Sequence, residues 1–180
     1  MIPYIAFMRA INVTGRYIKM AELAGHYLSL GQHDVRTFIN SGNVLFSSAQ
    51  AEADALQDDL EQQLEPLLGF RSELFLRTPA QLVDIARQAA QLRDARPAQE
   101  VNVLFLKQPL DAAQQQTLAA LQTSSDMLQH SGREIYWLSD AMQSQSKLSN
   151  AVFERKLRIR ATLRRHSMLQ QLAEQLASSA

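Results

Sequence analysis

Apolar positions along the first 77 residues predict six elements of secondary structure. Short apolar runs predict strands over residues 4–8, 35–39, 44–46 and 73–77. Apolar residues at helical spacing predict helices over residues 19–30 and 50–68, which end at Gly31 and Gly69. The order strand, helix, strand, strand, helix, strand is that of a ferredoxin-like unit.

The remaining residues predict a second α+β unit of similar size. Its helices are expected over residues 79–90, 110–121, 147–157 and 163–176, and its strands over residues 101–106, 127–130 and 134–138. Thr78-Pro79 is typical of a helix start, and the stretch 93–100 around Pro97 is expected to be a linker or surface loop. We therefore predict two subdomains, 1–78 and 79–180.

Two polar segments adjoin the predicted strands of the first subdomain. Arg9-Ala-Ile-Asn-Val-Thr-Gly15 follows the first strand, and Asn40-Ser-Gly-Asn43 joins the second to the third. In a ferredoxin-like sheet the first and third strands are antiparallel neighbours, so both segments are expected at one rim of the sheet. The next helix opens nearby, and its unpaired backbone N–H groups favour anions. The predicted ligand-binding residues of this rim are Arg9, Asn12, Lys19, Ser41 and Asn43.

Apart from Lys19, these residues also have a purely structural explanation. Gly42 and its neighbours are what a tight hairpin uses, because Gly and Asn accept positive φ angles. Asn12 can stabilise a turn by bonding its own backbone. Arg9 can pair with a helix carboxylate such as Glu22. Both interpretations are open at the level of the sequence.

The charge of the 180-residue chain is zero overall but uneven. Residues 1–150 hold 12 Lys and Arg against 16 Asp and Glu, whereas residues 151–180 hold 6 against 2. The basic cluster at 155–165 is interpreted as a helix end that complements the acidic body, with phosphate docking as the alternative. The chain lacks the basic excess that is typical of nucleic-acid binders.

No catalytic constellation is recognisable. Cysteine is absent, which excludes disulfides, thiolate metal sites and cysteine nucleophiles. The four histidines lack metal-ligand spacing, and Ser41 lies outside a G-x-S-x-G elbow. The sequence therefore predicts no metal, leaves any cofactor unknown, and leaves open whether the protein is an enzyme.

A cytoplasmic location without a membrane partner is expected. No run approaches the ~20 apolar residues needed to cross a bilayer. Residues 1–8 have no basic start, so a signal peptide is not expected.

Four segments carry a family resemblance. They are Arg9-Ala-Ile-Asn-Val13, Lys19-Met-Ala-Glu-Leu23, Asp34-Val-Arg-Thr-Phe-Ile-Asn-Ser-Gly-Asn-Val44 and Ser146-Lys-Leu-Ser-Asn-Ala-Val-Phe-Glu154. Together they resemble the bacterial family called domain of unknown function 1697, along the whole chain. The resemblance implies an α+β fold of two ferredoxin-like subdomains with mainly antiparallel sheets and C-terminal helices. It implies no activity, because none is established for the family.

The chain departs from this family in two places. The family usually reads Arg-Gly-Ile-Asn-Val-Gly-Gly where Ala10 and Thr14 stand here, so a loop that lets a ligand approach the backbone would be narrower in this chain. Near the C-terminus the family tends to carry Thr-Thr-Arg-Asn-Trp-Asn-Thr. The stretch 162–168 keeps Thr162 and Arg164 but lacks the Trp and both Asn, so a family site that uses them is altered or lost here.

Lys147 and Asn150 match the fourth of these segments. They are expected three residues apart on one helix face. We predict that they close over the polar rim from the second subdomain.

The predicted function is binding of an anionic small ligand, such as a nucleotide or a phosphorylated metabolite. Arg9, Lys19 and Lys147 would supply charge. The alternatives are a protein-interaction module without a ligand and a nucleic-acid-associated module, which is not favoured. The latter would stack bases on Tyr4, Phe7 and Phe46, but core packing explains these aromatic residues more simply. The sequence gives no oligomeric state.

Overall fold

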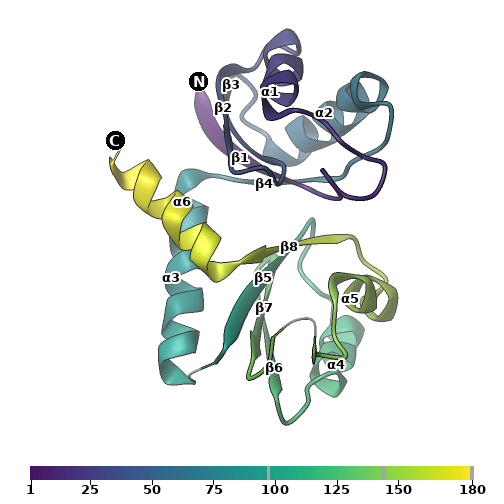
Figure 1. The fold of residues 1–180 in the computed structure, drawn as a ribbon, viewed down its shortest axis with the longest axis vertical. Helices are drawn as coiled ribbons and strands as arrows, with labels where there is room; N and C mark the ends of the chain where they lie inside the picture. Colours follow the sequence, from purple (N-terminus) through teal and green to yellow (C-terminus); the bar gives the residue numbers. More distant parts are fainter. Residues whose placement is uncertain (97, 143–144, 179–180) are drawn as a thin grey trace. The chain divides into compact units, whose positions relative to one another are not determined.

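Two compact units make up the chain: Met1–Gln81, the first unit, and Leu82–Ala180, the second unit (Figure 1). The structure is a computed structural model and describes residues 1–96, 98–142 and 145–178. Each unit contains one four-stranded antiparallel sheet with helices. The predicted α+β class with two antiparallel sheets is confirmed.

The first unit has the predicted ferredoxin-like order of elements. They are β1 (Ile2–Met8), α1 (Met20–Ser29), β2 (His33–Phe38), β3 (Asn43–Ser48), α2 (Ala53–Leu68) and β4 (Leu74–Arg77). The strands lie in the order β2-β3-β1-β4, and each neighbouring pair is antiparallel. The predicted helices and strands of this unit are therefore present, with ends that differ by a few residues.

The core of the first unit lies between the sheet and its two helices, α1 and α2. Leu23 and Tyr27 of α1 and the leucine stripe of α2 pack on alternate residues of the strands, as period-2 and period-3.6 patterns require. Tyr4 and Phe46 are part of this core, with ring centroids 5.9 Å apart.

The outer edge of β4 is covered by side chains of α2. Gln57 accepts a hydrogen bond from the backbone N–H of Leu76 at 3.1 Å, and Glu61 accepts one from Leu74 at 2.7 Å. Gln57 and Glu61 lie four residues apart, so both face the strand from one side of the helix. Both are buried, and their hydrogen bonds satisfy amides that an edge strand would otherwise leave open.

The second unit repeats the same strand order. Its elements are α3 (Pro79–Ala95), β5 (Glu100–Leu106), α4 (Ala112–Ala120), β6 (Asp126–Ser131), β7 (Glu134–Ser139), α5 (Asn150–Leu157), β8 (Ala161–Arg165) and α6 (His166–Ser178). The sheet order is β6-β7-β5-β8, antiparallel throughout. Topologically β5, β6, β7 and β8 correspond to β1, β2, β3 and β4.

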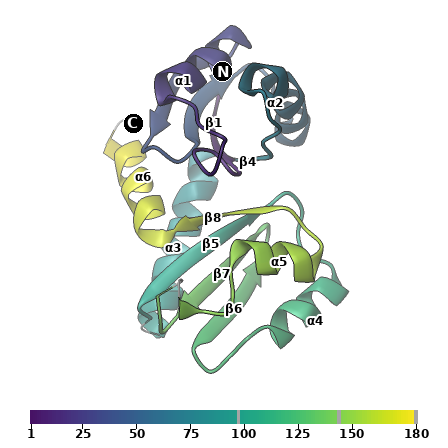
Figure 2. The ribbon, with the colours of Figure 1, turned by 45° about the vertical axis from the view of Figure 1, so that its right-hand side comes forward.

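The helices α4 and α5 pack on one face of this second sheet, where Trp137 contacts Phe153 edge-on with ring centroids 5.6 Å apart. The helix α6 lies beside α3 in both views (Figures 1 and 2). The imidazole Nε2 of His166, the first residue of α6, is 3.2 Å from the carbonyl oxygen of Ala86 in α3.

Two predictions about the second unit were wrong in detail. The predicted helix 163–176 begins only at His166, because residues 161–165 form β8 and pair with β5. The expected linker at 93–100 is shorter, since α3 continues to Ala95 and β5 starts at Glu100; Pro97 lies outside the described residues.

The basic cluster at 155–165 is therefore not a single helix end. It spans the end of α5, the left-handed residue Arg158 that ends it, and β8. Arg160 lies 4.0 Å from Glu154, and Arg165 lies 3.4 Å from Glu100. These pairs agree with charge complementarity inside the second unit.

Candidate functional site

The end of β1 and the β2–β3 turn meet at one rim of the first sheet. The backbone N–H of Met8 donates to the carbonyl oxygen of Gly42 at 2.8 Å. The side chain of Asn12 donates to Asn40 Oδ1 at 2.9 Å. The two polar segments that the sequence singled out are therefore in direct contact.

Asn12 holds together the loop between β1 and α1. Its Oδ1 accepts a hydrogen bond from the backbone N–H of Ile18 at 2.9 Å, and its own N–H donates to the Arg16 carbonyl at 2.8 Å. The Arg16 guanidinium lies over the ring of Phe70, 5.6 Å from its centroid. Asn12 thus has a structural role in this loop, and it still faces the surface groove described below.

Asn43 and Ser41 bond each other within the β2–β3 turn. Asn43 Nδ2 donates to Ser41 Oγ at 2.8 Å and to the Phe38 carbonyl at 3.1 Å. Asn43 is fully buried. Its amide therefore braces the turn and is not exposed to a ligand in solvent.

Gly42 is the position of this turn where only glycine fits. Its φ is +69°, and an added Cβ would lie 3.0 Å from Cβ of Ile11 and 3.1 Å from Cβ of Met8. Both the conformation and the space exclude a side chain. The turn consequently packs directly on the residues that leave β1.

Arg9 pairs with Glu73 rather than with Glu22, the partner suggested from the sequence. Its guanidinium Nη1 is 3.5 Å from Glu73 Oε2, and 22% of its side chain is exposed. Its carbonyl oxygen accepts a hydrogen bond from Ser72 Oγ at 2.7 Å. The helix carboxylate was the wrong partner because the start of β4 lies next to the end of β1.

Three non-glycine residues with positive φ, Ala10, Asn12 and Ile39, lie in or next to these polar segments. Within residues 1–96, 98–142 and 145–178, the non-glycine residues with positive φ are Ala10, Asn12, Asp34, Ile39 and Arg158. The left-handed conformation costs an L-residue about 1–2 kcal/mol, and such strain clusters at functional sites. The φ of +56° at Ala10 also gives a backbone reason for the glycine that the resemblance led us to expect there.

An open groove of about 740 Å³ runs beside this loop. It is lined by Asn12, Tyr17, Ile18, Lys19, Met20, Glu22 and Asn40. Of the predicted site residues, Asn12 and Lys19 line it, whereas Arg9, Ser41 and Asn43 do not. Tyr17 and Glu22 were not predicted as site residues, because neither belongs to the polar clusters that drew attention to the loop.

The first turn of α1 borders this groove and has no side-chain cap. Lys19 occupies the cap position with extended backbone angles, and its side chain makes no capping hydrogen bond. In the second unit, by contrast, Asp111 and Gln114 form a complete capping box at α4, and Ser149 caps α5. The amides at the start of α1 are therefore not occupied by a side-chain cap.

Lys147 and Asn150 belong to the second unit, and the prediction that they share one helix face was wrong. The helix α5 begins at Asn150 after its cap Ser149, so Lys147 precedes the helix and is exposed. Asn150 Nδ2 donates to the Ala161 carbonyl at 3.1 Å and so ties α5 to β8. A contribution of these two residues to a ligand site stays a prediction.

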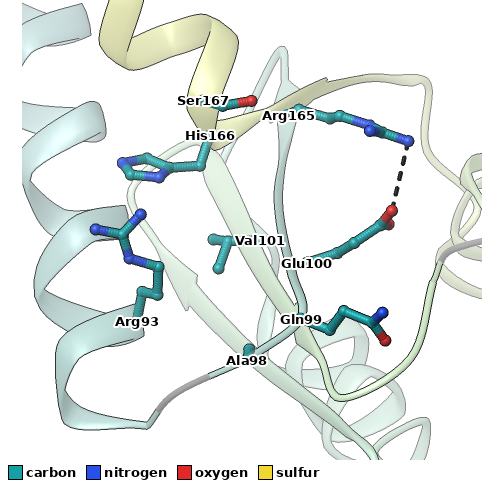
Figure 3. A pocket seen from close by; sticks show the side chains of 8 residues that line it. All are labelled: Arg93, Ala98, Gln99, Glu100, Val101, Arg165, His166 and Ser167. Carbon is teal, nitrogen blue, oxygen red and sulfur yellow. Dashed lines mark ion pairs between the residues drawn. The ribbon is translucent and has the colours of Figure 1, made fainter.

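A smaller hollow of about 160 Å³ lies in the second unit, between the end of α3, the start of β5 and the β8–α6 junction (Figure 3). The pair of Arg165 and Glu100 lies on one side of it, and Arg93 and His166 lie on the other. Burial lowers the pKa of His166, against the raising effect of its bond to Ala86. No pattern in the sequence predicted this hollow.

Neither a metal cluster nor a membrane span is found in the part of the chain that the structure describes. No three His, Asp or Glu side chains there are placed to hold a metal ion. No helix there is long and apolar enough to cross a bilayer.

Comparisons with known proteins agree with this architecture. Residues 1–136 match the family described as "Protein of unknown function (DUF1697)". The segment 146–168, which also entered the resemblance, lies beyond the matched residues. No curated protein matches the chain.

A solved structure of similar fold is that of the conserved bacterial protein SP0830 from Streptococcus pneumoniae. It superposes with a TM-score of 0.74 at 24% sequence identity, over 98% of this chain and 99% of that one. At this identity the likeness concerns the fold. With the family match over residues 1–136 and the repeated ferredoxin-like sheets, the chain belongs to the DUF1697 family of proteins of unknown function.

Proposed function

We propose that the groove beside the β1–α1 loop binds a small anionic metabolite. The observation that carries this proposal is the length and composition of that loop. Eleven residues (9–19) join β1 to α1, whereas five residues (107–111) make the corresponding connection between β5 and α4. The second unit forms the same strand order with its short loop, so this topology does not require the long loop of the first unit.

The side chains that line the groove fit a ligand of this kind. Lys19 brings a positive charge to the rim, and the amides of Asn12 and Asn40 offer hydrogen bonds beyond the one they share. The uncapped first turn of α1 adds backbone N–H groups on the same side. A phosphate or carboxylate would receive charge-assisted hydrogen bonds from these groups.

The nucleic-acid alternative loses its main support. It relied on stacking of bases on Tyr4, Phe7 and Phe46, and all three are at most 3% exposed. Base stacking needs open aromatic faces. A protein-interaction role remains the second candidate, because Val13 and Ile39 are apolar and about half exposed beside the groove.

Calorimetric titration of the full chain with adenosine monophosphate tests the proposal. Lys19→Gln removes the groove's positive charge, and we expect it to weaken binding about tenfold, the loss of one charge-assisted contact. Lys156→Gln, an exposed lysine on α5, is the matched control and should bind as the wild type does. Equal affinities of the two variants, or no binding to the wild type at millimolar ligand, would refute the proposal.

A further inference from the structure

We infer that the ligand of this groove carries an aromatic ring that stacks on Tyr17, and so is a nucleotide rather than a phosphorylated metabolite without a ring. The inference rests on the proposed function and narrows its substrate class. It concerns the first unit alone. Three observations carry it: the exposure of Tyr17, the apolar residues that flank the two asparagines, and the opposite charges of Lys19 and Glu22.

Tyr17 is the most exposed large apolar residue of the described chain, with 73% of its surface accessible, and it lines the groove. The other tyrosines, at positions 4, 27 and 136, are at most 2% exposed. A tyrosine presents a wide, rigid face at a low cost in conformational entropy, because it has only two side-chain torsions. An aromatic ligand would use this face, whereas a sugar phosphate alone would leave it open to water.

Apolar side chains accompany the polar pair on both sides of the rim. Val13 follows Asn12 in the loop and is 48% exposed, and Ile39 precedes Asn40 in the turn and is 52% exposed. The bond between the two asparagines brings these segments together. The rim therefore combines hydrogen-bonding groups with exposed apolar surface, as a ligand with a polar and an aromatic part requires.

The groove also holds charges of both signs, which a simple anion would not use. Lys19 and Glu22 lie three residues apart at the start of α1, and both line the groove. The Glu22 carboxylate lies 4.0 Å from the His26 imidazole, one turn further along the helix, and 60% of the Glu22 side chain is exposed. A carboxylate accepts hydrogen bonds only. Ribose hydroxyls or an exocyclic amine would supply them while a phosphate meets Lys19.

Calorimetric titrations with three probes separate the ring from the phosphate: adenosine monophosphate, ribose 5-phosphate and inorganic phosphate. We expect the full-length wild type to bind adenosine monophosphate about tenfold more tightly than ribose 5-phosphate, within the range of one base stacked on one aromatic side chain. Tyr17→Phe should keep this preference. Tyr17→Ala should abolish it by weakening adenosine monophosphate alone. Leu28→Ala, an exposed apolar residue of α1 outside the groove, is the control and should change neither affinity.

Equal binding of adenosine monophosphate and ribose 5-phosphate by the wild type would overturn this inference and leave the proposed function standing. An equal loss of both affinities in Tyr17→Ala would also overturn it, because Tyr17 would then shape the loop rather than contact a ring. If none of the three probes binds, this inference and the proposed function fall together. Circular dichroism of each variant shows whether the fold is intact before the affinities are compared.

Discussion

The two units form sheets with the same strand order, but the connections at one rim of these sheets differ in length. In the first unit the backbone N–H of Met8 donates to Gly42 at 2.8 Å, and in the second Leu106 donates to Arg133 at the same distance. The second unit reaches this rim with a short connection, a complete capping box and the two-residue turn Gly132-Arg133. The first unit reaches it with a long strained loop, an uncapped helix and a four-residue turn (39–42).

Some residues at these rims are needed for strand pairing, whereas others are additional to it. Both rims satisfy the same backbone hydrogen bond, so the extra residues of the first unit do not serve strand pairing. They form a groove and leave Tyr17 and Lys19 on the surface, where neither contributes to a hydrophobic core. The second unit shows the topology with short connections at this rim, and the first shows the same topology with longer ones.

The largest effect is expected from an alanine in the two turns. Gly42→Ala places a Cβ at positive φ and 3.0 Å from Ile11, and should lower the free energy of unfolding by about 3 kcal/mol. Gly132→Ala meets only Glu134 Oε2 at 3.5 Å, so about 1–2 kcal/mol is expected there. Urea unfolding measures both. A larger loss at Gly132 than at Gly42 would contradict the tighter packing of the first rim.

A smaller effect should come from Asp126, the buried first residue of β6 in the second unit. Trp137 donates to its Oδ1 at 2.8 Å, and Ser146 donates to the same carboxylate at 3.2 Å. Burial alone would raise the pKa of Asp126, but these bonds and those from Thr123 and Ser139 outweigh it and lower the pKa below 3.8. Asp126→Asn should lower the free energy of unfolding at pH 7 by about 2 kcal/mol.

The pH dependence of this effect has a defined sign. Because the folded-state pKa is lowered, the ionised carboxylate contributes its full stability above pH 3.8, the ordinary pKa, and loses it as the pH falls through the folded-state value. The difference between wild type and Asp126→Asn should therefore shrink as the pH falls through 3.8 toward the acid limit of folding. A difference that grows on acidification would show that Asp126 is not ionised in the folded protein.

The smallest effect concerns the strained loop. Ala10→Gly removes a left-handed alanine, with φ of +56°, at the cost of a more flexible unfolded chain. We expect the free energy of unfolding to rise by about 0.5 kcal/mol. Thermal unfolding of both proteins checks the change, and a loss of stability would mean that the Ala10 methyl group makes a contact worth more than the strain.

Much of the fold was predictable because most elements carry their own pattern. The apolar run of β1 and the leucine stripe of α2 each indicate one structure without help from the rest of the chain. The strand β8 was missed because its only large apolar residue, Leu163, also fits a helical repeat with the residues that follow. Its extended state comes from pairing with β5, a contact that no local pattern records.

The candidate site was predictable only in part, for a related reason. Asn12 and Lys19 stand out by residue type in a polar loop, whereas a single tyrosine in such a loop has no periodicity to mark it. Which side chains face the groove depends on the bond from Ile18 to Asn12 and on the positive φ values of the loop. These are properties of the folded loop and not of its composition.

The side chains of Gln57 and Glu61 along β4 also affect how readily this protein aggregates in concentrated solution. An incoming strand would have to form hydrogen bonds with the amides of Leu74 and Leu76, and α2 already occupies both. Fibrils that grow by adding strand to strand cannot start at this edge unless α2 first detaches. As long as α2 stays docked, it therefore blocks strand addition on one side of the first sheet.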